Sequence, residues 1–367
     1  MMWNPFKLLQ TLGYFRVAGS LKGIAEMVMP ASAPISFPAP SIATPAVLTV
    51  GLSAAAQTDL AQALAPLAYR VEAAESLDQG AANFRQEWVN VPILVWMADT
   101  SEPAMGQWQQ LVTQLSTTPA YSEATLIDFR HPTPSIQALW GSLDDVVMGG
   151  VSDSQVRWQE ALVFTGQVST ANSGGFASIR TRNLEPPLSL AQWQGTTLYA
   201  QGDGQRYKWI LRDSPGWDSL AHCRSFDTMT EQPITIRTPF LDMVATSRAR
   251  TVPQAAPLNP AQICSMQLML SKFEYDGDLN PSFQPGPFRL AISQVGMYRD
   301  APKPLVVLPA PLETAIENIQ PTLAAAGLTG IMPTANGFSL VGATRELPGW
   351  VDPEVVRQIC QTLMQAI

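Results

Sequence analysis

Charge is scarce in this chain. Only 14% of its 367 residues are Asp, Glu, Lys or Arg, whereas 46% are hydrophobic, and the formal net charge is -8. No run of Lys or Arg occurs anywhere in the sequence. Nucleic-acid binding through a basic face is therefore disfavoured, because neutralising phosphate groups requires clustered cations.

Cysteine and histidine are also scarce. The three cysteines, Cys223, Cys264 and Cys360, lie far apart and are odd in number. This argues against a disulfide framework or a Cys-rich zinc site, and it suits a reducing compartment. His131 and His222 are the two histidines, so metal or triad chemistry built on histidine has little material. The sequence predicts no metal site and no cofactor.

The N-terminal segment, residues 1–29, is basic on a chain that is otherwise acidic. No stretch of about 20 uninterrupted apolar residues exists, so no helix is expected to span a bilayer. The mixture of apolar and cationic residues instead predicts an amphipathic helix, on a membrane surface or in a partner's groove. A helix packed on the protein's own core is an equal alternative. The residues expected to make the membrane or partner contact are Phe6, Lys7, Leu9, Leu12, Phe15 and Arg16.

The rest of the chain divides into segments that differ in composition and hydrophobic pattern. Residues 30–45 form a Pro/Ala/Ser-rich linker. Residues 46–130 alternate apolar strands with helical stretches, which predicts βαβ units and a parallel sheet. Residues 131–300 contain short β-rich runs separated by turn residues, which is typical of an all-β sandwich or barrel. Helix–strand texture returns over residues 301–367. One α/β domain interrupted by a β domain is the simplest interpretation.

The stretch "WGSLDDVVMGGVSDS" contains the adjacent carboxylates Asp144 and Asp145. Paired carboxylates can perform acid/base chemistry or hold a hard cation. Neighbouring residues on a strand, however, point to opposite faces, so these two are not expected to converge. We expect one of them to cap a turn, with Gly149 and Gly150 supplying backbone conformations closed to other residues. A ligand or partner contact on the sandwich rim is the alternative.

Other polar and aromatic residues are candidates for a ligand or partner contact on the β domain. Arg180 and Arg182 should point away from the inward-facing Ile179, where they could contact a carboxylate or a sugar; a solvated strand face is the simpler interpretation. Aromatic side chains could also line a carbohydrate platform, although aromatics on short strands usually belong to the core. These aromatic residues are Tyr207, Trp209, Trp217 and Phe226.

Four segments in order resemble the complex I intermediate-associated protein 30 (CIA30) family. They are "WGSLDDVVMGGVSDS", "FTGQVSTANSGGFASIRT", "GDGQRYKWILR" and "MLSKFEYDG", between about residues 139 and 298. The resemblance implies a galactose-binding-like jelly-roll β-sandwich. It also implies an assembly factor for a large membrane complex, since the family is associated in mitochondria with respiratory complex I.

The flanking α/β segments are similar to an atypical short-chain dehydrogenase fold, into which cyanobacterial and chloroplast proteins insert this β domain. The similarity is carried by "LAAAGLTGIMPTANGF" and "GWVDPEVVRQICQTLMQA". It implies a degenerate Rossmann-like frame and photosystem II biogenesis at a thylakoid membrane. The turn "VGLSAAAQTD" keeps Gly51 but lacks the later glycines that a pyrophosphate needs. The Tyr-x-x-x-Lys pair of typical members is also missing, so no enzymatic activity is expected.

The sequence thus predicts a non-enzymatic assembly or maturation factor that acts through protein–protein binding. Its expected partners are subunits or assembly intermediates of a photosynthetic or respiratory membrane complex. It is expected to be peripheral on the cytoplasmic side of a membrane, or soluble in the cytoplasm or stroma. Two alternatives remain open: an NAD(P)-dependent short-chain reductase with a regulatory β insert, and a carbohydrate-binding module.

Overall fold

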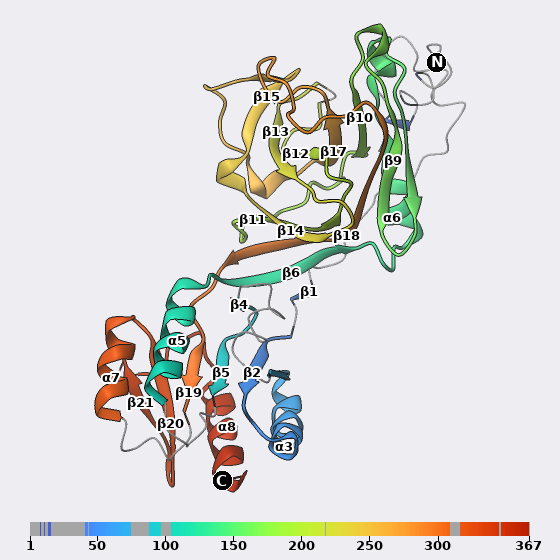
Figure 1. Cartoon of the computed structure of the whole chain (residues 1–367). Coiled ribbons are helices and arrows are strands. Elements are labelled where there is room, and N and C mark those ends of the chain that lie inside the picture. The colour runs from blue at the N-terminus through green and yellow to red at the C-terminus, as the bar shows by residue number, and fades with distance from the viewer. Residues whose placement is uncertain are drawn as a thin grey trace. The chain divides into compact units, whose positions relative to one another are not determined.

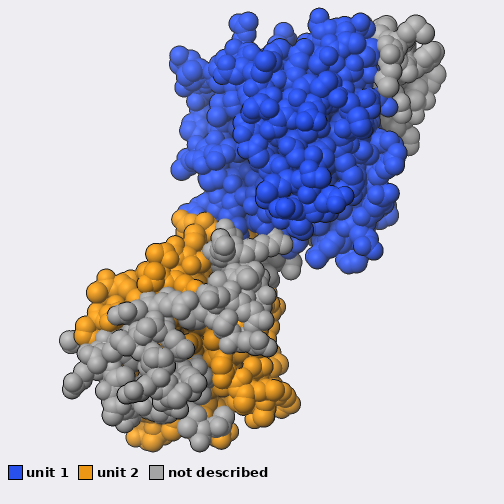
Figure 2. Space-filling view, viewed as in Figure 1, with its two compact units in different colours: residues 1–41, 124–298 blue, residues 42–123, 299–367 orange. Residues whose placement is uncertain are grey.

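The chain forms two compact units, shown in the computed structural model of Figures 1 and 2. Unit 1 comprises residues 1–41 and 124–298, and unit 2 comprises residues 42–123 and 299–367. A β domain thus interrupts an α/β domain, with boundaries at 123/124 and 298/299 rather than the expected 130/131 and 300/301. The structure describes residues 8, 11, 14–15, 41–42, 44–74, 88–96, 104–216, 218–308, 316–344 and 346–366.

Unit 1 is a β-sandwich, and one of its layers is a seven-stranded antiparallel sheet. Several of these strands lie side by side in Figure 1. Their spatial order is β16 (Arg250–Thr251), β15 (Val244–Ser247), β13 (Ala221–Asp227), β12 (Arg206–Arg212), β17 (Ser265–Ser271), β10 (Phe176–Thr181) and β7 (Trp140–Ser142).

The second layer comes from an eight-stranded sheet built around β18 (Gly286–Asp300). Its other strands are β1 (Ser41–Ile42), β6 (Ala120–Asp128), β11 (Gly195–Gln201), β14 (Pro233–Pro239), β9 (Leu162–Val168), β8 (Asp153–Trp158) and β4 (Trp88–Val89). The expectation of one parallel sheet for residues 46–130 is wrong for the apolar segment "ATLIDF" (residues 124–129). Most of this segment lies in β6, and Leu126, Ile127 and the adjoining Phe129 pack in the sandwich core.

The sandwich core follows from the period-2 alternation of the strands. On β12, Tyr207, Trp209 and Leu211 all point inward and are fully buried. The indole Nε1 of Trp209 donates to Thr196 Oγ1 at 3.0 Å, so its polar atom has a partner inside the core. Burying each such side chain stabilises the fold by about 1.5–3 kcal/mol.

Unit 2 is a three-layer α/β fold. Its sheet has the order β21 (Gly337–Gly342), β20 (Thr329–Thr334), β19 (Leu305–Val307), β5 (Ile93–Trp96), β2 (Ala46–Val50) and β3 (Arg70–Ala74). All neighbours are parallel except β20 and β21. Helices α3 (Ala54–Leu64) and α8 (Pro353–Ala366) cover one face, while α5 (Ala104–Thr117) and α7 (Ile316–Ala325) cover the other. Fully buried strands explain the continuous apolar runs in the sequence.

The strand order of unit 2 differs from that of the expected Rossmann-like frame. Numbered along the chain within the sheet, the described strands lie in the order 2-1-3-4-5-6. Dinucleotide-binding sheets have the order 3-2-1-4-5-6, whereas flavodoxin-type sheets begin 2-1-3-4-5. After β2, Gly51 takes φ +76 and Ser53 caps α3 by accepting the Ala56 N–H at 3.3 Å. The Ser53 side chain therefore caps the N-terminus of α3, the position at which a dinucleotide-binding turn holds a pyrophosphate.

Short helices occupy several connections. They are η1 (Ala65–Leu67), α6 (Pro134–Leu139), η2 (Asp145–Met148), η3 (Ala171–Ser173), η4 (Phe240–Asp242) and η5 (Pro260–Gln262). None of the helices in the described part of the chain is long and apolar enough to cross a membrane.

Candidate binding face of the sandwich

Asp145 is a buried backbone clamp. It is 1% exposed and begins η2 rather than lying on a strand, so the expectation from strand alternation does not apply to it. Its carboxylate accepts the N–H of Ser152 at 2.9 Å, the Ser152 hydroxyl at 2.7 Å and the N–H of Gly175 at 2.8 Å. These bonds join the turn after η2 to the start of β10.

Asp144 makes a second, separate clamp. Its carboxylate accepts the N–H and the hydroxyl of Ser154 at 2.9 and 2.5 Å, and the N–H of Ser178 at 3.1 Å. The two carboxylates therefore do not share a ligand. Gly149 takes φ +91 at the end of η2, the left-handed conformation that the turn hypothesis requires there. Both carboxylates of the motif thus accept hydrogen bonds from main-chain N–H groups and serine hydroxyls, which hold the backbone around the turn.

The side of the seven-stranded sheet that faces away from the sandwich core is here called the outer face. On β12, Ile210 lies between the inward residues and packs with Ala221 and Cys223 in a small cluster separate from the core. The cross-strand register brings polar residues to the same side of β10, β12 and β17. These outer-face residues are Ser178, Arg180, Lys208, Arg212, Ser265 and Gln267.

A hydrogen-bond relay connects the outer face to the carboxylate motif. Arg212 Nη1 donates to Gln267 Oε1 at 2.7 Å, and Gln267 Nε2 donates to Ser178 Oγ at 3.0 Å. The Ser178 hydroxyl in turn donates to the carbonyl of Leu143. Because Asp144 also holds the Ser178 N–H, the motif fixes the position of one end of this relay. The motif therefore helps to fix the outer-face residue Ser178 in place.

The outer face concentrates buried positive charge. Arg180 is only 3% exposed, so the expectation of a solvated strand face is wrong for this residue. Burial, and next the charge of Arg212, lower the pKa of Arg180. Burial also lowers the pKa of Arg212. Arg182, just beyond β10, is half-buried, and its guanidinium lies 4.3 Å from the ring centroid of Tyr14. Arg180 and Arg212 thus lie close together in a poorly solvated environment.

Lys208, the third outer-face cation, has a structural environment. Its Nζ donates to the carbonyls of Phe273 and Glu274 at 2.8 and 2.5 Å, and it lies 3.9 Å from Glu274 Oε2. Burial lowers the pKa of Lys208, and the charge of Glu274 partly offsets this. Lys208 therefore anchors the loop that follows β17.

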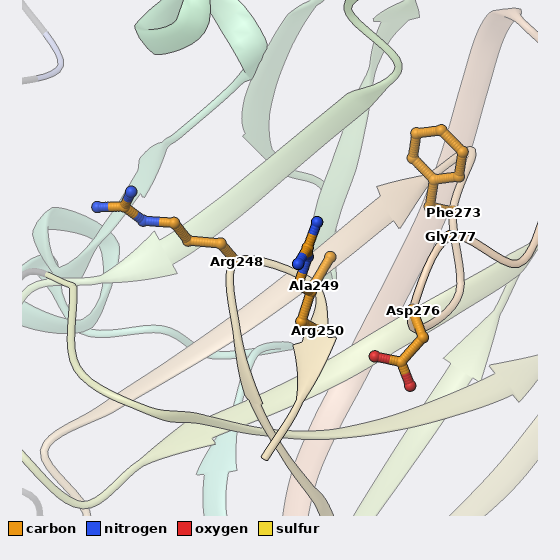
Figure 3. Close-up of a pocket in the computed structure, with 6 residues that line it drawn as sticks. All are labelled: Arg248, Ala249, Arg250, Phe273, Asp276 and Gly277. Atoms are coloured by element: carbon orange, nitrogen blue, oxygen red, sulfur yellow. The ribbon is translucent and has the colours of Figure 1, made fainter.

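That loop borders a hollow of about 420 Å³ on the sandwich rim. It is lined by Arg248, Ala249, Arg250, Phe273, Asp276 and Gly277 (Figure 3). Asp276 accepts the N–H and the hydroxyl of Thr251, both at 2.8 Å, and Arg248 pairs with Asp218 at 2.5 Å. Figure 3 shows the Arg248 guanidinium directed away from Asp276. These side chains do not converge on a common point. Across the residues that the structure describes, no group of three or more His, Cys, Asp or Glu could hold a metal ion.

The aromatic candidates are core residues. Tyr207 and Trp209 are fully buried and Phe226 is nearly so, while Trp217 lies outside the described residues. The Tyr207 hydroxyl donates to Asp203 at 3.0 Å, and burial raises the pKa of this tyrosine. A carbohydrate platform needs exposed ring faces, so Tyr207, Trp209 and Phe226 do not fit that role.

The described N-terminal residues contact the sandwich. Thr11 is buried, and the Tyr14 hydroxyl donates to the Ala138 carbonyl at 2.7 Å. Phe15 packs edge-on against Tyr14, with ring centroids 4.9 Å apart. These contacts favour the alternative in which this part of the segment packs on the protein itself. The remaining predicted contact residues lie outside the described residues: Phe6, Lys7, Leu9, Leu12 and Arg16.

Sequence reasoning missed Arg212, Gln267 and Lys208 as parts of the candidate face. A signal for them was present in the strand texts "YKWILRD" and "CSMQLMLSKF". Each places isolated polar residues at alternate positions in an otherwise apolar strand, which marks the side opposite to the core.

Comparison with known proteins agrees with the resemblance in the β domain. Residues 127–292 match the model of the family Complex I intermediate-associated protein 30 (CIA30). No curated protein matches the chain significantly.

Two solved structures are similar to about half of the chain. One is the family 11 carbohydrate-binding module of the cellulosomal cellulase Lic26A-Cel5E of Clostridium thermocellum, at 14% identity and TM-score 0.35, covering 48% of this chain and 94% of that chain. The other is the catalytic domain of an endo-1,3-beta-glucanase from Thermotoga petrophila RKU-1, at 11% identity and TM-score 0.28, covering 48% and 96%. These scores are too low to support an inference about ligands. The sandwich of this chain is thus similar to the CIA30 family over residues 127–292, which is less than half of the chain.

Proposed function

We propose that this protein is a non-enzymatic assembly or maturation factor for a large membrane energy-converting complex, of the complex I/NDH or photosystem II type. It binds a subunit or an assembly intermediate and holds it until the next partner arrives. The observation that carries the proposal is the CIA30 match over the sandwich, since that family is associated with complex I assembly.

The outer face of the sandwich carries the polar groups that are proposed to recognise the partner. Arg180 and Arg212 lie on adjacent parts of that face, and Gln267 is held between β10 and β12 by hydrogen bonds on both sides. Polar groups fixed by a rigid sheet recognise a partner at low entropic cost, because they need little ordering on binding. The hydrogen bond from the Ser178 N–H to Asp144 adds to that rigidity.

The α/β unit is proposed to serve as a scaffold without redox chemistry. A dinucleotide site places the pyrophosphate at a helix N-terminus that follows a glycine-rich turn. Here Ser53 occupies the N-terminus of α3, and Leu52 in the same turn is buried. The order of the described strands is also not that of a dinucleotide-binding sheet.

The N-terminal segment is proposed to bring the protein to the cytoplasmic or stromal side of the membrane. Its cations and apolar residues suit an anionic membrane surface, while Tyr14 holds the segment against Arg182 of the sandwich. Deleting residues 1–30 should leave a folded protein that no longer co-sediments with membranes. Full retention of the shortened protein in the membrane pellet would contradict this role.

The test of the proposed function is affinity capture of the tagged full chain from gently solubilised membranes, followed by mass spectrometry. Enrichment of subunits of one respiratory or photosynthetic complex over an untagged control is expected. Recovery of the protein without such subunits would overturn the proposal. Dinucleotide titration would then test the reductase alternative.

A further inference from the structure

Two arginines and a serine lie close together on the outer face. Arg180 of β10 and Ser265 of β17 are buried, and Arg212 lies opposite Ser265 in the β12–β17 register. Gln267, the register partner of Arg180, accepts a hydrogen bond from Arg212 Nη1. The three side chains therefore surround one small area of the sheet.

Part of this cluster lacks hydrogen-bond partners. The Nε of Arg212 and the hydroxyl oxygen of Ser265 are both shielded from solvent, and neither has a partner within the described residues. Leaving a buried polar group unsatisfied is costly, and more so when the group belongs to a cation. A ligand with acceptor atoms would remove this cost on binding.

Two carboxylates near this cluster, among the residues that the structure describes, are engaged elsewhere. Asp218 contributes to the electrostatic environment of Arg212, but it forms its ion pair with the exposed Arg248. Glu274 lies beside Lys208 and accepts the hydroxyl of Ser225 at 2.5 Å. The cluster thus combines positive charge with low solvation, and both favour an incoming anion.

We propose that Arg212, Arg180 and Ser265 form a binding site for a carboxylate group presented by an acidic peptide segment of the client protein. A carboxylate is planar and accepts paired hydrogen bonds from a guanidinium, and it can also accept the serine hydroxyl. The adjacent apolar cluster of Ile210 and Met269 would pack against the aliphatic part of a Glu side chain. This inference rests on the proposed function, because it names the chemistry by which the client is recognised.

The test is titration of the full chain with N-acetyl-tetraglutamate at low ionic strength, with tetraglutamine as the uncharged comparison. The arginine Nε–Hε signals in NMR report binding directly, and those of Arg212 and Arg180 are expected to shift with tetraglutamate only. Arg212→Gln and Arg180→Gln should weaken binding at least about tenfold, as expected for losing a charge-assisted hydrogen bond. Arg212→Lys should weaken it less. Arg248→Gln, which removes the same charge from the exposed rim, should leave the affinity within about twofold.

Several results would overturn the site. Equal weakening by Arg248→Gln and Arg212→Gln would mean that the peptide binds through overall charge. Equal binding of tetraglutamine, or the absence of any arginine shift, would exclude carboxylate recognition. Shifts with inorganic phosphate but not with tetraglutamate would assign a different ligand. The wild-type NMR titration remains informative even if a variant fails to fold.

The site and the proposed function fail in different ways. Capture of the same client by the wild type and by Arg212→Gln would leave the assembly role and remove this site. Tetraglutamate binding without any captured client would leave this site and remove the assembly role.

Discussion

Replacing Asp145 by Asn keeps the size of the side chain and removes its charge. One carboxylate oxygen accepts the Ser152 hydroxyl and the Gly175 N–H, at 2.7 and 2.8 Å. An Asn side chain offers one neutral carbonyl oxygen and one NH2 group, so at least one main-chain N–H would face another donor, and the bonds that remain would no longer be made to a charged acceptor. Each hydrogen bond to a charged group contributes about 1.5–3 kcal/mol, so the free energy of unfolding should fall by about 4 kcal/mol. For a unit of this size, that corresponds to a Tm lower by about 8–16 °C.

Thermal unfolding of the full chain, followed by near-ultraviolet circular dichroism, measures this effect. Asp278→Asn is the matched control, because Asp278 is exposed and its replacement removes the same charge from the same unit. The control should change the Tm by less than about 2 °C, as is usual for exposed positions. An Asp145→Asn protein as stable as the control would refute the view that the motif is a backbone clamp.

Two further changes test other parts of the structure. Burial lowers the pKa of His222 below its ordinary 6.5, so on acidification the unfolded chain takes up this proton before the folded chain does, and stability should decline from about pH 7 downward. Urea unfolding at several pH values should show a weaker decline for His222→Gln and an unchanged decline for the exposed His131→Gln; identical profiles would contradict this. Lys208→Met should lower the free energy of unfolding by about 3 kcal/mol, because it leaves Glu274 without its buried cationic partner. A loss below about 1 kcal/mol in urea unfolding would show that Lys208 does not anchor its loop.

Local sequence patterns predicted the elements of the α/β unit well. The segment "DPEVVRQICQTLMQAI" has the pattern of a terminal helix, with Asp352 able to cap it and Pro353 in its first turn. In the structure the helix begins at Pro353, and Asp352 accepts the Glu354 N–H at 2.8 Å. Helix α7 forms although Pro321 lies inside it. These features depend on neighbours in the chain, which a sequence displays directly.

Pairing between distant strands was harder to predict. The "ATLIDF" strand has the apolar texture of a buried parallel strand, yet β6 belongs to the sheet of the sandwich. The polar strand β8 was not predicted, since its alternation is weak and its residues are mostly polar. An apolar strand satisfies either sheet equally well, so long-range packing decides its place.

The candidate face shows the same limit. Period-2 alternation correctly placed Arg180 on the side opposite Ile179, but it did not predict that this side is buried. It also favoured the core for Tyr207 and Trp209, where the structure places them. Which polar residues share one face depends on the register of β10, β12 and β17, and register is set by three-dimensional pairing.

The most direct test of the central claim is a comparative capture experiment. Tagged wild type, Arg212→Gln and Arg248→Gln proteins would be recovered from the same gently solubilised membranes, and their co-purifying proteins quantified by mass spectrometry. Subunits of one energy-converting complex should accompany the wild type and Arg248→Gln and be depleted with Arg212→Gln. Equal recovery of those subunits with all three proteins, or with none, would contradict this prediction.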